Sequence, residues 1–247
     1  MTELAEFRET VLDNARIRPG DTVLDAGTGT GLIALGATER VGADGDVLAL
    51  DVSVDCLEDL RRASTASNIF YLIGSADVLP LPDTSVDVVC TRSVLIYVND
   101  KEEAAREFFR VLRSGGRVSI FEPINRRRRH ISEVVDFGTL AQEVREWEGE
   151  VDASGDDPMM NFDERDLERF FTAAGFDAIE LDLRPGEAEL SPDRWLTAIG
   201  APGRKSVLDV WAKRFPADQL EELLSIVRTH GSLRLAWPQL YLTAVKP

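Results

Sequence analysis

A regular alternation of short apolar runs and longer segments with helical spacing constrains the fold more than any other feature of this sequence. Short runs typical of buried strands occur at residues 22–26, 47–51, 69–73, 86–91 and 117–122. Helical spacing of apolar residues occurs between them, at residues 2–16, 32–41, 54–66 and 100–113. Strands that alternate with helices pair in parallel, because the helix returns the chain to the same end of the sheet. The pattern therefore predicts an α/β fold, with a doubly wound, mostly parallel sheet covered by helices on both faces.

Capping residues and glycines mark the predicted ends of these helices. Ser53 precedes the helical pattern at residues 54–66, and Asp100 opens the next pattern as the first residue of a capping box. The pair Gly115-Gly116 is expected to stop that second helix, because glycine is favoured just beyond a helix C-terminus.

The second half of the chain is less regular than the first. Two insertions, at about residues 124–162 and 185–236, have largely helical patterns, and prolines interrupt the second. A further strand is expected at 177–183 and a last one at 239–245. We expect a single domain over residues 1–247, with its core at about 15–123, 163–183 and 239–246. The insertions are expected to form a helical cap over the ligand pocket.

Composition and charge exclude several classes of protein. The 247 residues include 44 acidic and 28 basic side chains, which give a formal net charge of −16. We expect no nucleic-acid partner, because phosphates require clustered lysine and arginine. The sequence has neither a signal-peptide pattern nor about 18 consecutive apolar residues, so we expect no membrane span and a cytoplasmic location. Cys56 and Cys90 are too few for a disulfide framework and are expected to be packing residues, with no metal site.

A glycine-rich turn follows the first predicted strand. Its glycines, Gly27, Gly29 and Gly31, allow the backbone to turn sharply and to approach a ligand closely. The helix that begins after Gly31 offers free N–H groups and a positive dipole end, which suit a carboxylate or a phosphate. A turn of this kind also closes many strand-to-helix connections for packing alone, so by itself it is weak evidence for a ligand.

Acidic residues follow three of the predicted strands at the same edge of the sheet. Asp25 ends the first strand, Asp51 ends the second 20 residues after Gly31, and Asp77 follows the third. A carboxylate at Asp51 can accept both hydroxyls of a ribose, and one at Asp77 can accept an exocyclic amine such as that of adenine. Each acid alone fits a strand-end cap or a surface residue. Their coincidence at the edge where open α/β sheets bind ligands predicts a nucleoside site.

Four segments resemble class I SAM-dependent methyltransferases. They are VLDAGTGTG at 23–31, the acid at Asp51, GSADVLPLPDTSVDVV at 74–89 and REFFRVLRSGGRVSIFEP at 106–123. The resemblance is greatest to the small-molecule branch that includes the ubiquinone and menaquinone biosynthesis enzymes, the type 11-like methyltransferases. It covers about residues 15–123. It implies S-adenosyl-L-methionine as cofactor and a seven-stranded sheet whose last strand is antiparallel.

The same resemblance assigns expected roles around the cofactor. Asp25 and the glycine loop would hold the methionine part, and Asp51 would bind the ribose, with Val52 against the adenine. Asp77 would receive the adenine amine, the Val78 N–H would face a ring nitrogen, and the main chain near Arg92 would meet the methionine ammonium. The complete set of expected cofactor residues is Asp25, Ala26, Gly27, Thr28, Gly29, Gly31, Asp51, Val52, Ala76, Asp77, Val78 and Arg92.

Two alternative functions fit part of this pattern. The segment from Gly29 to Ala34 satisfies the G-x-G-x-x-A fingerprint of nicotinamide oxidoreductases, and Asp51 follows at a suitable distance. Against that reading, Asp25 would place a negative charge where a diphosphate approaches, whereas the charge suits a ligand with an ammonium and a sulfonium. A protein that binds SAM without transferring its methyl group is the other alternative.

The predicted reaction is transfer of a methyl group to an O, N or C atom of a small organic molecule. Some acceptors need a base to remove a proton, and His130, Tyr97 and Glu122 follow strands at the predicted ligand edge. We expect at least one of them to contact the substrate. The alternative readings are an exposed histidine beside arginines, a packed tyrosine and a glutamate paired with a nearby arginine.

The two insertions contain further candidate substrate contacts. Arg126 to Arg129 would suit an anionic group of the substrate, although a solvated run neutralised by acids such as Glu133 is favoured. Large apolar side chains there would enclose an apolar substrate, form the core of the cap or form a dimer interface. These side chains are Trp147, Trp195, Trp211, Trp237, Met159 and Met160.

Overall fold

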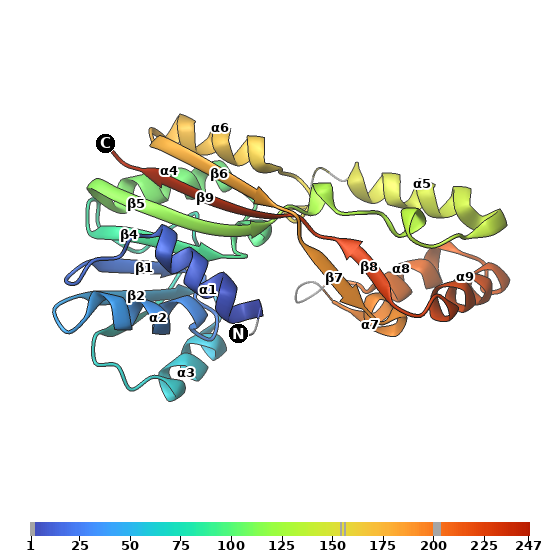
Figure 1. Cartoon of the computed structure of the whole chain (residues 1–247), viewed down its shortest axis with the longest axis horizontal. Helices are drawn as coiled ribbons and strands as arrows, with labels where there is room; N and C mark the ends of the chain where they lie inside the picture. The colour runs from blue at the N-terminus through green and yellow to red at the C-terminus, as the bar shows by residue number, and fades with distance from the viewer. Residues whose placement is uncertain (1–2, 154, 156, 200–203) are drawn as a thin grey trace. The chain divides into compact units, whose positions relative to one another are not determined.

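The computed structural model describes residues 3–153, 155, 157–199 and 204–247 (Figure 1). The chain divides into two compact units. The first, which we call the sheet unit, comprises residues 1–124, 156–184 and 239–247. The second, the helical unit, comprises residues 125–155 and 185–238. The assignment of the whole chain to one domain with a cap over its pocket stays a prediction.

Within the described residues, seven strands form the sheet of the sheet unit in the order β3-β2-β1-β4-β5-β9-β6. Only β9 runs antiparallel to its neighbours, β5 and β6. The predicted α/β class, the doubly wound sheet and the antiparallel last strand are therefore confirmed. The strands are β1 Thr22–Ala26, β2 Asp46–Asp51, β3 Ile69–Ile73, β4 Val86–Arg92, β5 Leu112–Pro123, β6 Asp177–Arg184 and β9 Gln239–Val245.

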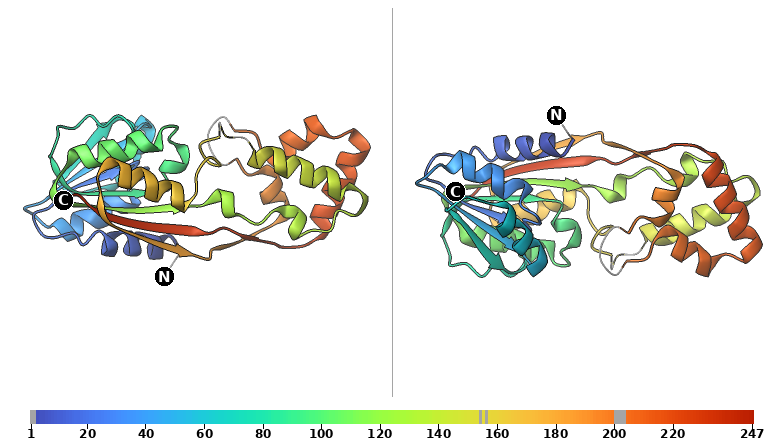
Figure 2. Two further views of the ribbon diagram at one scale, coloured as in Figure 1. Left: turned by 90° about the horizontal axis from the view of Figure 1, so that it is seen from above. Right: turned by 90° about the horizontal axis from the view of Figure 1, so that it is seen from below.

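Helices cover both faces of this sheet (Figure 2). One face packs against α1, α2 and α3 through side chains such as Leu12, Ile33 and Leu60. The other face packs against α4 and α6 through Phe108 and Phe171, both fully buried. The central strands are apolar on both sides because both faces are covered. The helices are α1 Glu3–Asn14, α2 Leu32–Val41, α3 Val54–Ala63, α4 Lys101–Val111 and α6 Glu164–Ala174.

The predicted helix starts are confirmed by side-chain caps. The Ser53 hydroxyl accepts a hydrogen bond from the Cys56 N–H at 3.3 Å, and the Asp100 carboxylate accepts one from the Glu103 N–H at 2.8 Å. Each cap satisfies a backbone donor that the first helical turn leaves free. In the described part of the chain, no helix has both the length and the apolar character needed to cross a membrane.

The predicted role of Gly115 and Gly116 is wrong. Helix α4 ends earlier, at Val111, and strand β5 already begins at Leu112. Gly115 has a φ of +76° and donates its N–H to the Lys246 carbonyl at 2.8 Å. The glycine pair therefore lies at an irregularity in the β4–β5 register, where an L side chain would be strained, and it does not stop the helix.

The helical unit also contains a pair of strands that the sequence reading missed. Strands β7 and β8 pair in antiparallel register, in a segment predicted to be helical. The signal available in the sequence was the alternation of apolar and polar residues, with Leu233 and Leu235 on either side of Arg234. The elements of this unit are η2 Asn125–Arg127, η3 Ile131–Glu133, η4 Gly138–Leu140, α5 Ala141–Asp152, β7 Glu187–Leu190, α7 Pro192–Thr197, α8 Val207–Arg214, α9 Ala217–Thr229 and β8 Leu233–Ala236.

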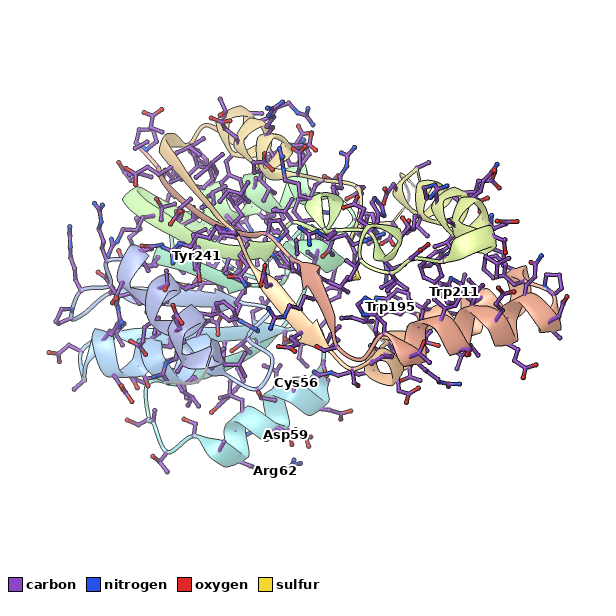
Figure 3. All side chains as sticks on the ribbon, turned by 45° about the vertical axis from the view of Figure 1, so that its right-hand side comes forward. Cys56, Asp59, Arg62, Trp195, Trp211 and Tyr241 are labelled. Carbon is purple, nitrogen blue, oxygen red and sulfur yellow. The ribbon has the colours of Figure 1, made fainter. Side chains whose placement is uncertain are left out.

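Trp211 is the centre of the helical unit's core (Figure 3). Its fully buried ring makes edge contacts with the rings of Trp147, Trp195, Phe137 and Phe215, at centroid distances of 5.4 to 6.2 Å. Three of the tryptophans considered as substrate contacts are thus packed against one another inside this unit. Met159 and Met160 belong instead to the sheet unit, where Met160 is buried.

Replacing Trp211→Ala is expected to lower the free energy of unfolding by about 3–5 kcal/mol, because it leaves a large cavity in the helical unit. Trp237→Ala is the comparison, since that residue is 38% exposed; it loses the hydrogen bond from its Nε1 to Asn125 Oδ1 and should cost about 1–2 kcal/mol. Urea unfolding followed by far-UV circular dichroism measures both values. Equal losses from the two variants would contradict the assignment of Trp211 as the central core residue.

Candidate functional site

The candidate site lies at the carboxyl edge of the sheet unit. Strands β3, β2, β1 and β4 are neighbours in the sheet and run in the same direction, so the loops that follow them meet at one edge. All the sequence-predicted cofactor residues lie at the ends of these strands or in these loops. The topology therefore brings together side chains that are up to 67 residues apart, from Asp25 to Arg92.

The three glycines of the loop after β1 have positive φ angles, of +73° at Gly27, +53° at Gly29 and +91° at Gly31. Packing accounts for two of them. A Cβ at Gly27 would lie 2.3 Å from a methyl of Val94, and one at Gly31 would lie 2.2 Å from a methyl of Leu60. A Cβ at Gly29 would meet nothing within 4 Å. Gly29 is thus the point of the loop where the open backbone can receive a ligand.

The Asp51 carboxylate fixes the open part of this loop. Its Oδ2 accepts a hydrogen bond from the Gly29 N–H at 2.8 Å, and its Oδ1 accepts one from the Ser53 N–H at 2.9 Å. The Asp51 carbonyl accepts from the Gly74 N–H, at 3.1 Å, so this residue joins the loops after β1, β2 and β3. Each carboxylate oxygen has a second lone pair with which it can accept a hydroxyl.

Asp25 lies beneath the loop and is 1% exposed. Its Oδ2 accepts hydrogen bonds from the Thr28 hydroxyl at 2.7 Å and from the Ala34 N–H at 2.9 Å. Burial raises the pKa of Asp25 to about 7, because the charged form loses its hydration. The structure therefore gives Asp25 the role of a buried brace between the loop and the first turn of α2.

The loop after β3 contains the third acid and an exposed apolar residue. The Ser75 hydroxyl donates to Asp77 Oδ1, and the Val78 N–H donates to the Ser75 carbonyl at 3.1 Å. That N–H, which was expected to face an adenine nitrogen, is thus used within the turn. Val78 and Val52 are 72% and 71% exposed. Two exposed valines beside carboxylates suit the faces of a flat ring.

Other predicted cofactor residues present only their main chain to this edge. Ala26, Thr28 and Ala76 are buried, so their side chains pack inward. The Arg92 guanidinium lies over the rings of Phe7 and Phe121, at 5.6 and 5.8 Å from their centroids. The expectation for Arg92 concerned its main chain, and that expectation stays a prediction.

Glu122, one of the three candidates for a substrate contact, holds the loop after β4. It is fully buried at the end of β5 and accepts hydrogen bonds from three backbone N–H groups of the loop after β4. Those of Val94 and Leu95 reach Oε1 at 2.8 Å, and that of Ile96 reaches Oε2 at 3.3 Å. Burial raises the pKa of Glu122 to about 7. The geometry makes this carboxyl a support for the loop, and contact of Glu122 with a substrate stays a prediction.

The other two catalytic candidates lie in different units. Tyr97 ends the short helix η1 (Leu95–Tyr97) after β4 and is 48% exposed, at the edge that carries the cofactor residues. His130 belongs to the helical unit, where its Nε2 lies 3.0 Å from Asp152 Oδ2 and its Nδ1 lies 3.7 Å from Glu148 Oε1. Contact of Tyr97 or His130 with a substrate stays a prediction.

The arginine run also belongs to the helical unit. Arg126, Arg127 and Arg129 are exposed, and Arg128 forms an ion pair of 3.4 Å with Asp152. Part of the run is thus neutralised by an acid on α5, in agreement with the favoured reading of a solvated segment, although the acid is not the one expected. Recognition of an anionic substrate by these arginines stays a prediction.

Lys101 is a charged residue of this region that the sequence reading missed. It is 3% exposed, and its Nζ donates to the Val98 carbonyl at 2.9 Å and to Asn161 Oδ1 at 2.8 Å. Burial lowers the pKa of Lys101 to about 8. The available signal was its place directly after the N-cap Asp100, because the positive end of a helix dipole disfavours a cation.

Comparison with protein families adds an independent finding. Residues 24–120 match the model of a methyltransferase domain. The match includes the loops after β1, β2, β3 and β4, and therefore the whole set of predicted cofactor residues.

Curated relatives match about half of the chain. The chain is 39% identical over 120 residues to a ubiquinone/menaquinone biosynthesis C-methyltransferase UbiE of Xanthomonas oryzae pv. oryzae, a match that covers 47% of each protein. It is 34% identical over 120 residues to the UbiE protein of Vibrio vulnificus, with 47% of this chain and 46% of that protein covered. The chain thus spans about half the length of the curated relatives it matches.

Solved structures share the fold over nearly the whole chain. A protein of Bacillus halodurans described as a putative methyltransferase superposes with a TM-score of 0.68 at 17% identity, covering 98% of this chain and 99% of that one. A phosphoethanolamine N-methyltransferase of Haemonchus contortus, in complex with S-adenosyl-L-methionine, superposes with a TM-score of 0.59 at 18% identity. The match covers 98% of this chain and 52% of that one. The [4+2]-cyclase SpnF superposes with a TM-score of 0.58 at 18% identity, and the match covers 98% of this chain and 80% of that one.

The raised pKa of Asp25 predicts an unusual pH dependence of stability. Its carboxyl takes up a proton in the folded state near pH 7 but in the unfolded state near pH 3.8. The stabilising contribution of the protonated form is therefore full below pH 3.8 and lost as the pH rises through 7. Relative to Asp25→Asn, the wild-type free energy of unfolding should fall by on the order of 3 kcal/mol between pH 4 and pH 7.5.

Urea unfolding of the two proteins at a series of pH values measures this difference. The variant keeps an oxygen that accepts from Thr28 and Ala34, so hydrogen-bond losses are small and do not change with pH. Parallel curves for the two proteins would contradict the prediction.

Proposed function

We propose that the chain is a SAM-dependent methyltransferase that transfers the methyl group of S-adenosyl-L-methionine to a small organic molecule. The methyltransferase domain at residues 24–120 supports this proposal. The observation that carries it is the Asp51 carboxylate, which holds the Gly29 N–H at the open point of the glycine loop. This arrangement offers a hydroxyl acceptor beside an accessible backbone, as a ribose and its substituent require.

The shape and polarity of the edge fit each part of this cofactor. Asp51 would accept the ribose hydroxyls, and Val52 and Val78 would cover the faces of the adenine, whose amine would donate to Asp77. The methionine part would lie along Gly29 and the main chain after Arg92. The exposure of both valines, at 71% and 72%, supports the adenine position, because burying them against a ring removes apolar surface from water.

The charge of the site favours SAM over a nicotinamide dinucleotide. Asp25 and Asp51 are both within hydrogen-bond reach of the glycine loop. A diphosphate on this loop would face two carboxyl groups, whereas a sulfonium and an ammonium would be attracted to them. When bound, SAM would supply an activated methyl group and would leave as the neutral thioether S-adenosylhomocysteine.

This chain's own part in the reaction is to position the acceptor and to receive its proton where one is lost. Tyr97 is the accessible candidate on the sheet unit, and a role for His130 stays a prediction from the sequence. Glu122 is better suited to holding the loop, because all three of its hydrogen bonds are to backbone N–H groups. An ionised or strongly nucleophilic acceptor would need no base from the protein.

We propose an O, N or C atom as the acceptor. The curated relatives named above are C-methyltransferases, which makes a carbon acceptor the finer form of the proposal. Arg126 to Arg129 would suit an anionic substituent on the substrate. We propose a small organic metabolite as the substrate and the cytoplasm as the location. The acidic composition supports the absence of a nucleic-acid partner.

A SAM-binding protein without methyl transfer is a second candidate. The observation that favours it is the likeness to SpnF, which is described as a cyclase although its fold is shared with methyltransferases. Formation of S-adenosylhomocysteine during incubation with SAM and a metabolite extract distinguishes the two candidates, whereas affinity for SAM does not.

Isothermal titration is expected to show binding of SAM and S-adenosylhomocysteine, and no binding of NAD. Asp51→Ala should weaken SAM binding by about tenfold to a hundredfold, because it removes the acceptor of both ribose hydroxyls. Asp44→Ala, in the exposed turn before β2, is the matched control and should bind as the wild type does. Binding of NAD in place of SAM would overturn the proposal.

Two glycine variants separate the role of binding from that of packing. Gly27→Ala should lower the free energy of unfolding by about 3 kcal/mol, because its Cβ collides with Val94 and its φ is positive. Gly29→Ala should cost only about 1–2 kcal/mol, the strain of the backbone alone. At a temperature where both remain folded, Gly29→Ala should be the variant with the larger loss of SAM affinity. The reverse order would contradict the placement of the ligand at Gly29.

A further inference from the structure

Two buried side chains of opposite charge hold the two ends of the short helix η1. At its N-terminal end, the Glu122 carboxylate accepts the N–H groups of Val94, Leu95 and Ile96. An anion at this position satisfies donors that a helical turn leaves free. Glu122 comes from β5, so the contact fixes the loop after β4 to the next strand of the sheet.

Lys101 occupies the opposite end of the same helix. Its Nζ donates to the carbonyl of Val98, the residue that caps η1, and to Asn161. It also lies 4.7 Å from the centroid of the Phe162 ring. A cation at the C-terminal end of η1 complements the partial negative charge of its carbonyls. The ammonium thereby joins η1, the start of α4 and the segment that leads to α6.

The Lys101 charge does not stabilise α4, and the Glu122 charge is not needed for the pairing of β5. A buried charge loses its hydration, and Lys101 also lies at the positive end of α4, where a cation is disfavoured. The Lys101 and Glu122 charges attract each other across η1, which offsets part of this cost. Asp157 is a further acid whose charge acts on Lys101. Both side chains form hydrogen bonds to the backbone at the ends of η1.

The position of η1 matters to the site because of the residues at its two ends. Val94 contacts the glycine loop closely, since a Cβ on Gly27 would lie 2.3 Å from its methyl group. Tyr97, at the other end, is half-exposed at the edge of the sheet. A shift of η1 would therefore move both the wall of the glycine loop and the accessible tyrosine.

We propose that Lys101 and Glu122 act together as positioning residues, which hold η1 so that Val94 and Tyr97 keep the geometry the transferase site needs. The functional half of this inference rests on the proposed function. The structural half, the local fixing of η1, can be measured without any cofactor.

Hydrogen exchange of the full chain in the absence of ligand tests the structural half. Lys101→Met and Glu122→Gln are near-isosteric changes that remove one charge each. Each should accelerate exchange of the amides of residues 94–98 by about tenfold, while the amides of β1 and β2 keep the wild-type rate. Lys213→Met, an exposed lysine of α8, is the matched control and should change neither set.

The double variant tests whether the two charges act together. Its acceleration at residues 94–98 should be at least threefold smaller than the product of the two single effects, because each single change leaves the other charge buried without its partner. Asn161→Ala, which removes only one acceptor of Lys101, gives a milder change and keeps the test available if a charge variant does not fold.

Titration with S-adenosylhomocysteine tests the functional half. Local acceleration together with about fivefold weaker binding in both charge variants supports the proposal. Unchanged exchange at 94–98, or equal acceleration throughout the sheet unit, overturns the positioning role. Local acceleration with wild-type affinity overturns the link between η1 and the site. Failure of the wild type to bind would reject the proposed function, and the exchange data would still decide the role of the two charges.

Discussion

The hydrogen bond from the Gly29 N–H to the Asp51 carboxylate is the interaction on which the proposed site depends. It fixes a left-handed glycine backbone at the edge of the sheet, at a point where an added Cβ would meet no atom within 4 Å. The same residue joins its own loop through Ser53 and the next loop through Gly74. The carboxylate thus joins the loops after β1 and β2, and its oxygens keep lone pairs for a ligand, while the main-chain carbonyl of the same residue joins the loop after β3. These bonds act together with those from the Gly27 and Thr28 N–H groups to the Leu50 carbonyl, at 2.7 and 2.8 Å, which also hold the glycine turn against β2.

Buried charges do a second kind of positioning in this protein. Asp25 braces the glycine loop from beneath, and Glu122 and Lys101 hold the two ends of η1. Each of these groups has a pKa displaced toward its neutral form, because burial penalises the charge. Charged hydrogen bonds are stronger than neutral ones. In the loop after β4 they hold the backbone, while the Leu95 and Ile96 side chains of the same loop are buried in the core of the sheet unit.

The fold and the chemistry have different kinds of support. The strand order, with one antiparallel strand, and the likeness to solved structures define the architecture over nearly the whole chain. That architecture is shared by proteins described as methyltransferases and by one described as a cyclase. The proposed activity therefore rests on the methyltransferase-domain match and on the individual contacts of the acids and glycines at the sheet edge.

The sequence by itself determined the α/β class, the position of most strands and helices, and the edge at which the acids gather. These features follow from local rules, namely apolar periodicity, caps such as Ser53 and the conformational freedom of glycine. Only the tertiary structure decided what each charged group does. Glu122, one of three candidates for a substrate contact, supports a loop through backbone hydrogen bonds, and the role of Lys101 depends on its burial. The Gly115 pair and the β7–β8 strands were misassigned for the same reason. Burial and pairing arise between segments distant in the chain, and no local pattern specifies which partner a side chain will meet.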